Sequence, residues 1–255
     1  MTKIIISGCN GKMGRVLTSC AVEREDCEVV AGIDMNPSEQ DAFPVYRSPA
    51  EFPGKADVLI DFSNPSLLAD LLEYGKKTHT PLVLCTTGYD NAQTSAVKKA
   101  AEEIPVFCSG NMSIGISLLI ELAKKAGQVL GESFDVEIIE KHHNQKIDAP
   151  SGTALMIADG ISQSENRNMR YVYDRHSQRK RRSSDEIGIH SVRGGSIVGE
   201  HEVIFAGPEE VLTISHSAQS KRIFAAGALN AAIFLTSKGA GLYNMADFIN
   251  QEGLL

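Results

Sequence analysis

The chain has 255 residues, of which 42% are hydrophobic and 22% charged, and a formal net charge of −7 at pH 7. This length and composition indicate a soluble globular protein with one large domain or two smaller ones. The acidic balance argues against nucleic acid as the main partner, because phosphate binding relies on an excess of Lys and Arg. No apolar run approaches the roughly 18 residues of a membrane span.

The cysteines and the N-terminus bear on the cellular compartment. The cysteines form no CxxC pair and are odd in number: Cys9, Cys20, Cys27, Cys85 and Cys108. This usage suits reduced thiols and indicates neither a disulfide framework nor a zinc site. The N-terminal apolar run is too short for a signal peptide. We therefore expect a cytoplasmic protein without a metal site.

The first hundred residues alternate short apolar runs with helical patterns. Runs rich in Val and Ile suit strands buried on both faces of a parallel sheet, and they occupy residues 3–8, 27–34, 56–62, 81–87 and 105–110. Helical patterns that begin at an Asn or Asp N-cap lie between them, at residues 64–77 and 90–103. This alternation predicts an α/β fold with an open parallel sheet and right-handed crossovers.

From about residue 113 the pattern changes. A long helix is predicted over 113–131, a strand over 134–142 and a helix that begins near 151. The polar stretch 163–186 contains the basic run RHSQRKRR (175–182), which we interpret as a mobile, solvated loop rather than a nucleic-acid patch. Apolar alternation over 187–218 then indicates an antiparallel set of strands. The pattern predicts an α+β second domain with a mixed or antiparallel sheet, and the final helix over 220–239 is expected to return to the first domain.

The first chemical motif is GCNGKMG, in which Gly8, Gly11 and Gly14 follow a predicted strand with the spacing GxxGxxG. Glycines let the backbone approach a pyrophosphate, and the helix that follows offers free N–H groups. Asp34 ends the second predicted strand, where a carboxylate can bind the ribose hydroxyls of a dinucleotide. A Rossmann-type dinucleotide site is the prediction, and a purely structural tight turn is the alternative.

Asp34 also bears on the choice of dinucleotide. Its carboxylate would repel a 2′-phosphate, and the next residue is Met35 rather than an arginine. NADH is therefore expected to be preferred over NADPH, although Lys12 and Arg15 near the phosphates could soften that preference.

Two loops follow the fourth and fifth predicted strands, CTTG (85–88) and SGNMS (109–113). They lie at the carboxyl edge of the sheet, where open α/β sheets bind their ligands. We expect both loops to contact the nicotinamide side of the dinucleotide.

The stretch EKHHNQKIDAPSGTA (140–154) combines two histidines and a lysine with a predicted helix start. Backbone N–H groups at Ser151, Gly152 and Thr153 can bind a carboxylate, and Lys146 adds a positive charge. In an extended segment His142 shares a face with residue 146 and not with residue 143, so the two histidines are expected to differ in role. A substrate-anion site is favoured over a polar surface turn.

Further downstream, several polar residues stay open to interpretation. The segment Arg193-Gly194-Gly195 is either another anion contact or a hairpin bend. For His201, His216 and Arg222 a structural role competes equally with a catalytic one.

Taken in order, GCNGKMG, CTTG, SGNMS, EKHHNQKIDAPSGTA and VRGGSIVGEHEVIFAG resemble the dihydrodipicolinate (4-hydroxy-tetrahydrodipicolinate) reductase family of lysine and diaminopimelate biosynthesis. The resemblance covers nearly the whole chain, and HHxxKxDAPSGTA is its most specific part. It implies a Rossmann domain over 1–112 completed by the C-terminal segment 218–255, and a substrate-binding and tetramerisation domain over 113–217. It also implies a homotetramer that uses NADH or NADPH to reduce 4-hydroxy-tetrahydrodipicolinate, with loss of water, to tetrahydrodipicolinate.

The resemblance further implies roles for single residues. His142 resembles the family's proton donor or acceptor, and Lys146 its proton donor. Positions that bind the carboxylates of the substrate are matched by His143, Gly152 and Thr153, beside Ser151 at the predicted helix start. Cofactor-binding positions are matched by Gly8, Cys9, Asn10, Gly11, Lys12, Met13, Asp34, Cys85, Thr86, Thr87, Ser109, Gly110, Asn111 and Met112. The chain departs from the family at Cys85, where Gly or Ala is frequent, and in the strongly basic run 175–182.

Two rival functions are weighed against this one. A semialdehyde dehydrogenase would need a cysteine nucleophile in the second domain, and no cysteine follows residue 108. A dinucleotide-sensing regulatory protein that binds nucleic acid through its basic run would not need HHxxKxDAPSGT, and the acidic net charge disfavours it.

Overall fold

The structure is a computed structural model that describes residues 1–37, 42–164 and 168–251. It divides into two compact units, which are Met1–Ser113 together with the segment from Lys221 onward, and Ile114–Ser220. Residues 252–255 of the predicted C-terminal segment and residues 165–167 of the predicted polar stretch lie outside the described residues.

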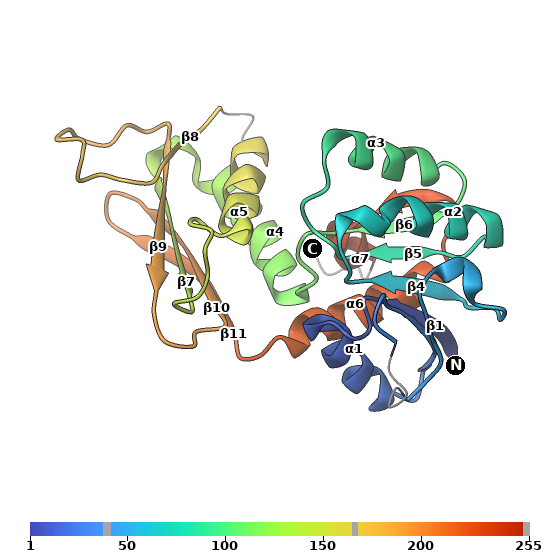
Figure 1. The fold of residues 1–255 in the computed structure, drawn as a ribbon. Helices are drawn as coiled ribbons and strands as arrows, with labels where there is room; N and C mark the ends of the chain where they lie inside the picture. Colours follow the sequence, from blue (N-terminus) through green and yellow to red (C-terminus); the bar gives the residue numbers. More distant parts are fainter. Residues whose placement is uncertain (38–41, 165–167, 252–255) are drawn as a thin grey trace. The chain divides into compact units, whose positions relative to one another are not determined.

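The first unit contains a parallel sheet of seven strands in the order β12-β6-β5-β4-β1-β2-β3 (Figure 1). Its strands are β1 (Thr2–Ser7), β2 (Cys27–Ile33), β3 (Val45–Tyr46), β4 (Val58–Asp61), β5 (Leu82–Leu84), β6 (Pro105–Cys108) and β12 (Gly241–Tyr243). The predicted open parallel sheet is confirmed. Its order reverses between β1 and β4, and ligands of such sheets bind beside the carboxyl ends of the strands at that reversal.

Helices cover both faces of this sheet (Figure 1). Helices α1 (Lys12–Val22) and α6 (Arg222–Leu235) pack on one face, and α2 (Leu68–Thr78) and α3 (Asn91–Ala100) on the other. Side chains alternate along a strand, so Ile4 and Ile6 join the core under α1 and α6, whereas Ile5 joins the core under α2 and α3. The short helix α7 (Met245–Gln251) follows β12.

Helix α6 approaches the backbone of the first unit very closely at Gly227. A Cβ built on Gly227 would lie 1.7 Å from the carbonyl oxygen of Met112. Only glycine permits this approach, which places α6 directly behind the loop that follows β6. The C-terminal segment therefore supports the loop after β6, although the two are far apart in the sequence.

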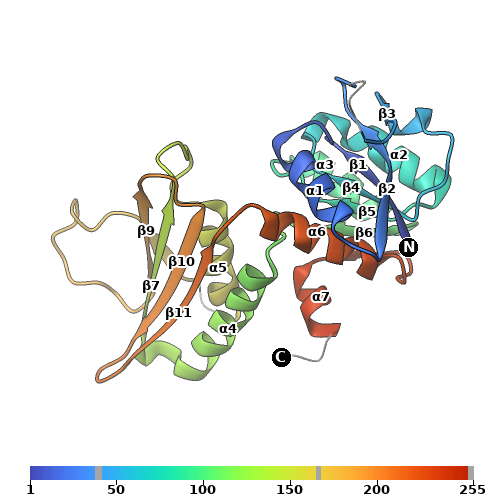
Figure 2. The ribbon, with the colours of Figure 1, turned by 90° about the horizontal axis from the view of Figure 1, so that it is seen from below.

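The second unit contains a sheet of five strands in the order β11-β10-β7-β9-β8 (Figure 2). Its strands are β7 (Asp135–His142), β8 (Arg170–Val172), β9 (Glu186–Arg193), β10 (Gly199–Ala206) and β11 (Val211–Ala218). Helices α4 (Ile114–Leu130) and α5 (Gly152–Ser164) cover one face. The core between them includes Ile138, Ile157 and Phe205, all fully buried.

The predicted antiparallel set over 187–218 is wrong for its first strand. Strand β9 pairs in parallel with β7, with Ile189 opposite Ile138, and only the pairs of β10 with β7 and with β11 are antiparallel. Strand β7 therefore lies between β9 and β10, and Arg193-Gly194-Gly195 crosses the end of β7 instead of forming a hairpin bend. An alternating pattern reports a half-buried strand but carries no information about the neighbouring strand or its direction.

The basic run 175–182 is attached to the second sheet at both of its ends. Arg175 donates from Nη1 to Glu186 Oε2 at 2.8 Å, and Arg182 donates from Nη2 to the carbonyl oxygen of Glu186 at 2.7 Å. The residues between them are exposed. The interpretation as a solvated loop therefore describes residues 176–181, while Arg175 and Arg182 are structural ion-pair partners.

Candidate active site

The glycine motif forms a tight turn at the carboxyl end of β1. Gly8 has φ +75°, and a Cβ at this position would lie 2.8 Å from the carbonyl oxygen of Phe62. A Cβ on Gly14 would lie 2.1 Å from the carbonyl oxygen of Gly8, so α1 packs directly on the turn. Gly11 is the N-cap of α1 and offers no side-chain cap. The first N–H groups of α1, near Lys12 and Met13, are thus available for an anion such as a pyrophosphate.

Asp34 lies immediately after β2 and holds the glycine turn. Its Oδ2 accepts a hydrogen bond from the backbone N–H of Asn10 at 3.0 Å, and its Oδ1 accepts one from the N–H of Asn36 at 3.0 Å. Each carboxylate oxygen has two lone pairs, so each can still accept a ribose hydroxyl. Arg15 donates from Nε to the carbonyl oxygen of Asn10 at 3.1 Å.

The loop after β5 is fixed by a buried carboxylate at the end of β4. Asp61 is fully buried and accepts hydrogen bonds from Thr86 Oγ1 at 2.6 Å and from Ser63 Oγ at 2.5 Å. Cys85 is buried in the core, and burial raises the pKa of its thiol. Thr87 is exposed. The hydroxyl of Thr86 is thus committed to the protein, whereas Thr87 is the threonine of this loop that faces outward.

The loop after β6 is stabilised by its own side chains. Ser109 donates from Oγ to the carbonyl oxygen of Asn111 at 2.7 Å, and Asn111 Oδ1 accepts the N–H of Ser113 at 2.9 Å. Met112 is buried against α6, and Gly110 is exposed. These bonds hold the loop in one conformation at the carboxyl edge of the sheet, as a cofactor-contacting loop requires.

In the second unit, His142 is the last residue of β7 and is 9% exposed. Its Nδ1 lies 2.6 Å from Oε2 of the fully buried Glu140. Its Nε2 lies over the neighbouring strand β10, where a Cβ built on Gly199 would come within 3.1 Å of it. His143 is half-buried, and its Nδ1 has no hydrogen-bond partner among the described residues. The two histidines thus occupy different environments.

Lys146 lies in the turn that follows β7. Its backbone N–H donates to the carbonyl oxygen of His143 at 3.1 Å, and its Nζ lies 2.8 Å from Asp148 Oδ1. The lysine side chain is 22% exposed, and its hydrogen bond lowers the pKa of Asp148. An ammonium group that is partly desolvated and pairs with a surface carboxylate can also bind an anionic ligand.

The turn leads into α5, whose first residues have distinct surroundings. Ser151 is buried, donates its N–H to Glu140 Oε1 at 3.1 Å, and accepts the N–H of Ala154 with its Oγ at 3.2 Å. Gly152 is exposed, and a Cβ built on it would meet no atom within 4 Å. Ser151 therefore builds the helix start. The backbone N–H of Gly152 contributes to the lowered pKa of Asp148, so the carboxylate that pairs with Lys146 lies at the positive end of the helix dipole.

Burial lowers the pKa values of two neighbouring histidines, His142 and His201. Burial lowers the pKa of His142 below its ordinary value of 6.5, against the opposing effect of Glu140. Burial also lowers the pKa of His201 to about 3. His201 lies on β10, with its Nε2 3.1 Å from Ser151 Oγ and its ring 5.3 Å from that of His142. Both imidazoles are therefore neutral near pH 7.

Glu140 is not among the site residues predicted from the sequence motifs, and Arg193 is predicted only as one of two alternatives. Residues two apart in a strand share a face, so Glu140 and His142 could have been recognised as neighbours from their spacing. Arg193 binds both carboxylate oxygens of Glu140, at 2.7 and 2.8 Å. No local pattern could have paired them, because 53 residues separate the two.

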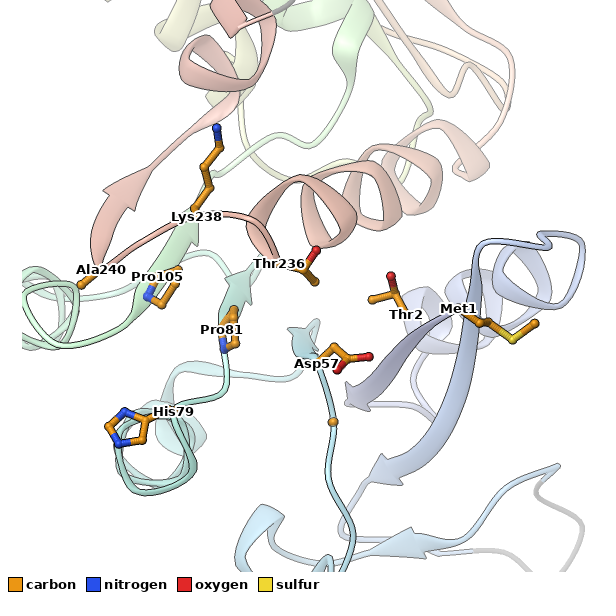
Figure 3. A pocket seen from close by; sticks show the side chains of 10 residues that line it. Met1, Thr2, Asp57, His79, Pro81, Pro105, Thr236, Lys238 and Ala240 are labelled. Atoms are coloured by element: carbon orange, nitrogen blue, oxygen red, sulfur yellow. The ribbon is translucent and has the colours of Figure 1, made fainter.

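A hollow of about 570 Å³ lies at the opposite, amino edge of the first sheet, between Thr2, Pro81 and Pro105 (Figure 3). Its charged residues already have partners. Asp57 accepts the N–H of Lys3 at 2.7 Å, and Lys238 Nζ lies 4.4 Å from the centre of the Phe234 ring. Because ligands of open α/β sheets bind at the carboxyl edge, that edge, and not this hollow, is the candidate cofactor site.

Comparison with known proteins identifies the family. Residues 2–112 match the family model "Dihydrodipicolinate reductase, N-terminus" and residues 115–249 match "Dihydrodipicolinate reductase, C-terminus". The 4-hydroxy-tetrahydrodipicolinate reductases of Caldanaerobacter subterraneus subsp. tengcongensis and Clostridium tetani are 53% and 46% identical to this chain. Each alignment covers 98% of this chain, and 99% and 98% of the respective relative.

A solved structure supports the same assignment. Dipicolinate-bound dihydrodipicolinate reductase from Paenisporosarcina sp. TG-14 superposes with a TM-score of 0.81 at 27% identity, covering 98% of this chain and 99% of that one. Among the described residues, no helix is both long and apolar enough to cross a membrane. The two family models together span nearly the entire sequence, and the chain belongs to the dihydrodipicolinate reductase family.

Proposed function

We propose that this chain catalyses the NAD(P)H-dependent reduction of 4-hydroxy-tetrahydrodipicolinate, with loss of water, to tetrahydrodipicolinate in the diaminopimelate route to lysine. The observation that carries the proposal is the grouping of His142, Lys146 and the first turn of α5 within one short segment of the second unit. The family membership and the names of the relatives support the same reaction.

The first turn of α5 and the side chains before it suit a dicarboxylate. The N–H groups of Gly152 and Thr153 lie at a helix N-terminus, which favours a negative charge by about 0.3–1 kcal/mol. Lys146 supplies a full positive charge in the preceding turn. We assign the first carboxylate to the helix start and Lys146, and the second to His143, whose buried Nδ1 has no partner among the described residues.

The chain's own residues orient the ring and move protons. When bound, the nicotinamide supplies a hydride to the ring carbon conjugated to the imine, and negative charge then develops on the ring nitrogen. Because the lowered pKa of His142 leaves it neutral near pH 7, we assign donation of the proton to Lys146. We assign to His142 Nε2 the acceptance of the proton that a ring carbon gives up when water is lost. General acid catalysis of this kind contributes about 10²–10⁴-fold.

For the cofactor we propose NADH as the preferred form. The carboxylate of Asp34 keeps acceptor capacity for the ribose hydroxyls and would repel a 2′-phosphate. We further propose a homotetramer assembled through the second sheet. In its support, the edge strand β11 exposes Val211 and Leu212, and an exposed strand edge is a template for pairing with another chain.

A coupled assay tests the reaction and the cofactor together. Pyruvate and aspartate semialdehyde are condensed by the preceding synthase, and this protein is then added with NADH or with NADPH. We expect consumption of the reduced nicotinamide only when substrate and protein are both present, with a higher kcat/KM for NADH. Absence of consumption with either cofactor, from a protein that still binds NADH, would overturn the proposed reaction and leave the fold assignment intact.

Matched variants test the role of Asp34. We expect Asp34→Asn to lower the ratio of kcat/KM for NADH to that for NADPH, because the charge that repels a 2′-phosphate is removed. Asp57→Asn removes a carboxylate that also accepts a backbone N–H, at the amino edge of the sheet, and should leave the ratio unchanged. An unaltered ratio in Asp34→Asn would exclude this carboxylate as the source of the preference.

Gly152→Ala is expected to raise KM for the dicarboxylate on the order of tenfold, because its methyl group would occupy the space above the start of α5. The fold should tolerate this change, since the added Cβ meets no protein atom within 4 Å and alanine is a better helix former than glycine. Steady-state kinetics and thermal unfolding measure both effects. Gly239→Ala, an equally open and exposed glycine of the first unit, is the control, and equal KM values in the two variants would refute the placement of the carboxylate.

A further inference from the structure

Glu140 is a fully buried carboxylate whose hydrogen-bonding capacity is used completely. Oε1 accepts from the N–H of Ser151 at 3.1 Å and from Arg193 Nη2 at 2.7 Å. Oε2 accepts from Arg193 Nη1 at 2.8 Å and lies 2.6 Å from His142 Nδ1. These four donor groups face its four lone pairs, and the side chain of Ser191 adds a further hydrogen bond. Such a carboxylate has no capacity left for substrate, and its effect must be exerted through its neighbours.

Arg193 keeps this carboxylate charged. Burial raises the pKa of Glu140, but the hydrogen bonds from Arg193, Ser191, His142 and the N–H of Ser151 outweigh burial and lower the pKa to about 2. The bidentate geometry is the strong form of an Arg–carboxylate pair. Removal of the arginine would leave an uncompensated buried charge, which is costly.

A charged carboxylate determines which nitrogen of His142 carries the proton. An ionised Glu140 can only accept hydrogen bonds, so His142 Nδ1 must be the donor across their 2.6 Å contact. In the neutral imidazole the other nitrogen is then an unprotonated acceptor. His142 Nε2 is consequently the nitrogen that can exchange a proton with a ligand.

The same ion pair is bonded to the two other parts of the site. Through Oε1, Glu140 holds the N–H of Ser151 at the start of α5. Arg193 Nη2 also donates to the carbonyl oxygen of Asp148 at 2.6 Å, in the turn that carries Lys146. One buried ion pair therefore holds the imidazole of His142, the turn that carries Lys146 and the start of α5.

We propose that Glu140, clamped by Arg193, is the positioning residue of this site: it holds His142 in the tautomer with a proton on Nδ1 and fixes the Lys146 turn and the start of α5 relative to that imidazole. The inference rests on the proposed function for the importance of the site, but the tautomer itself is a property of the protein without substrate.

The first test is the tautomer of His142 in the wild-type protein. Histidine-selective ¹⁵N labelling and long-range ¹H–¹⁵N correlation spectra distinguish a protonated from an unprotonated ring nitrogen, and the missing signal in His142→Gln assigns the residue. We expect a protonated Nδ1 and an unprotonated Nε2 at neutral pH. A proton on Nε2 in the wild-type protein would overturn the proposal, whatever the protein's substrate is.

Glu140→Gln provides the second test, because the geometry predicts a reversal. The Oε1 position faces two obligate donors, Ser151 N–H and Arg193 Nη2, so the amide oxygen should take this position. The amide NH₂ then takes the Oε2 position, where the hydrogen bond from Arg193 Nη1 is lost and His142 Nδ1 can respond by accepting a hydrogen bond. We therefore expect the proton of His142 to move to Nε2. We also expect kcat to fall by at least about tenfold, because acid–base catalysis contributes about 10²–10⁴-fold.

A matched control separates positioning from stability. Glu186 is also nearly fully buried, in β9 of the same sheet, and is held by Arg170 and Arg175. Glu186→Gln should lower stability without changing the His142 tautomer or kcat beyond a factor of two. NADH binding should be the same in both variants. An unchanged tautomer and kcat in a folded Glu140→Gln protein, or equal losses in both variants, would refute the positioning role.

The conservative variant Arg193→Lys completes the series. Lysine retains the positive charge but cannot bind both carboxylate oxygens and the carbonyl of Asp148 together. We expect the Nδ1–H tautomer to persist and the KM for the dicarboxylate to rise, because the charge on Glu140 is kept while the Lys146 turn is released. Reversal of the tautomer in this variant would contradict the separate roles assigned to the two residues.

Discussion

Lys146→Ala is expected to lower kcat by about 10²–10⁴-fold while NADH binding remains near normal. The ammonium group lies in the turn between His142 and α5, where it pairs with Asp148 Oδ1 at 2.8 Å. Its removal leaves the nitrogen of the substrate ring without the assigned proton donor, whereas the glycine turn and Asp34 belong to the other unit. Steady-state kinetics and equilibrium binding of NADH measure the two quantities.

Lys141→Ala is the matched control for this prediction. Lys141 lies five residues earlier on β7 and has a comparable single ion pair, with its Nζ 3.1 Å from Glu200 Oε2. The same change in charge at this position should leave kcat unchanged. Unimpaired turnover in Lys146→Ala would remove Lys146 from the mechanism, and a similar loss in both variants would point to a general electrostatic effect.

His201→Phe is expected to reduce the loss of stability that the second unit undergoes as the pH falls. The pKa of His201 falls from 6.5 in the unfolded chain to about 3 in the folded protein, so below pH 6.5 the unfolded state binds more protons. The free energy of unfolding therefore drops by about 1.4 kcal/mol for each pH unit between about 6.5 and 3. Phenylalanine retains a buried ring but does not titrate. Loss of the hydrogen bond to Ser151 lowers the free energy of unfolding by about 1 kcal/mol.

Hydrogen exchange of the β10 amides in increasing urea, repeated from pH 7.5 to 4.5, follows this unit by itself. We expect the variant to be the less stable protein at pH 7.5 and the more stable one at pH 4.5. Val203→Ala, at a fully buried position of the same strand, should lower stability equally at all pH values. Parallel curves for wild type and His201→Phe would show that the buried imidazole does not control the acid transition.

The parallel sheet could be predicted from local patterns, whereas the second sheet could be predicted only in part. Fully buried runs such as 58–60 and 82–84 are apolar throughout, and this pattern is typical of a strand covered on both faces. The alternating run that became β9 was recognised as a strand, but its parallel pairing with β7 was not. The short strands β3, β8 and β12 have only two or three residues, too few for a periodicity to be visible.

The candidate site shows the same division. His142, Lys146 and Gly152 could be proposed from one contiguous stretch, because a turn and a helix start bring neighbours in sequence together in space. The contacts of Arg193 with Glu140 and of His201 with Ser151 could not, because 53 and 50 residues separate the two members of each pair. Gly227 is a further example, since nothing around it in the sequence shows that its α-carbon packs on the carbonyl of Met112.

The sequence by itself determined the α/β class, the glycine turn with Asp34, and the family, because each depends on residue types at short, regular spacings. Only the tertiary structure decided the order and direction of the second sheet's strands, the anchoring of Arg175 and Arg182, and the ion pair beneath His142. These features arise from contacts between residues tens of positions apart, whose free energy depends on burial and on geometry. Local patterns carry neither quantity, and the folded chain supplies both.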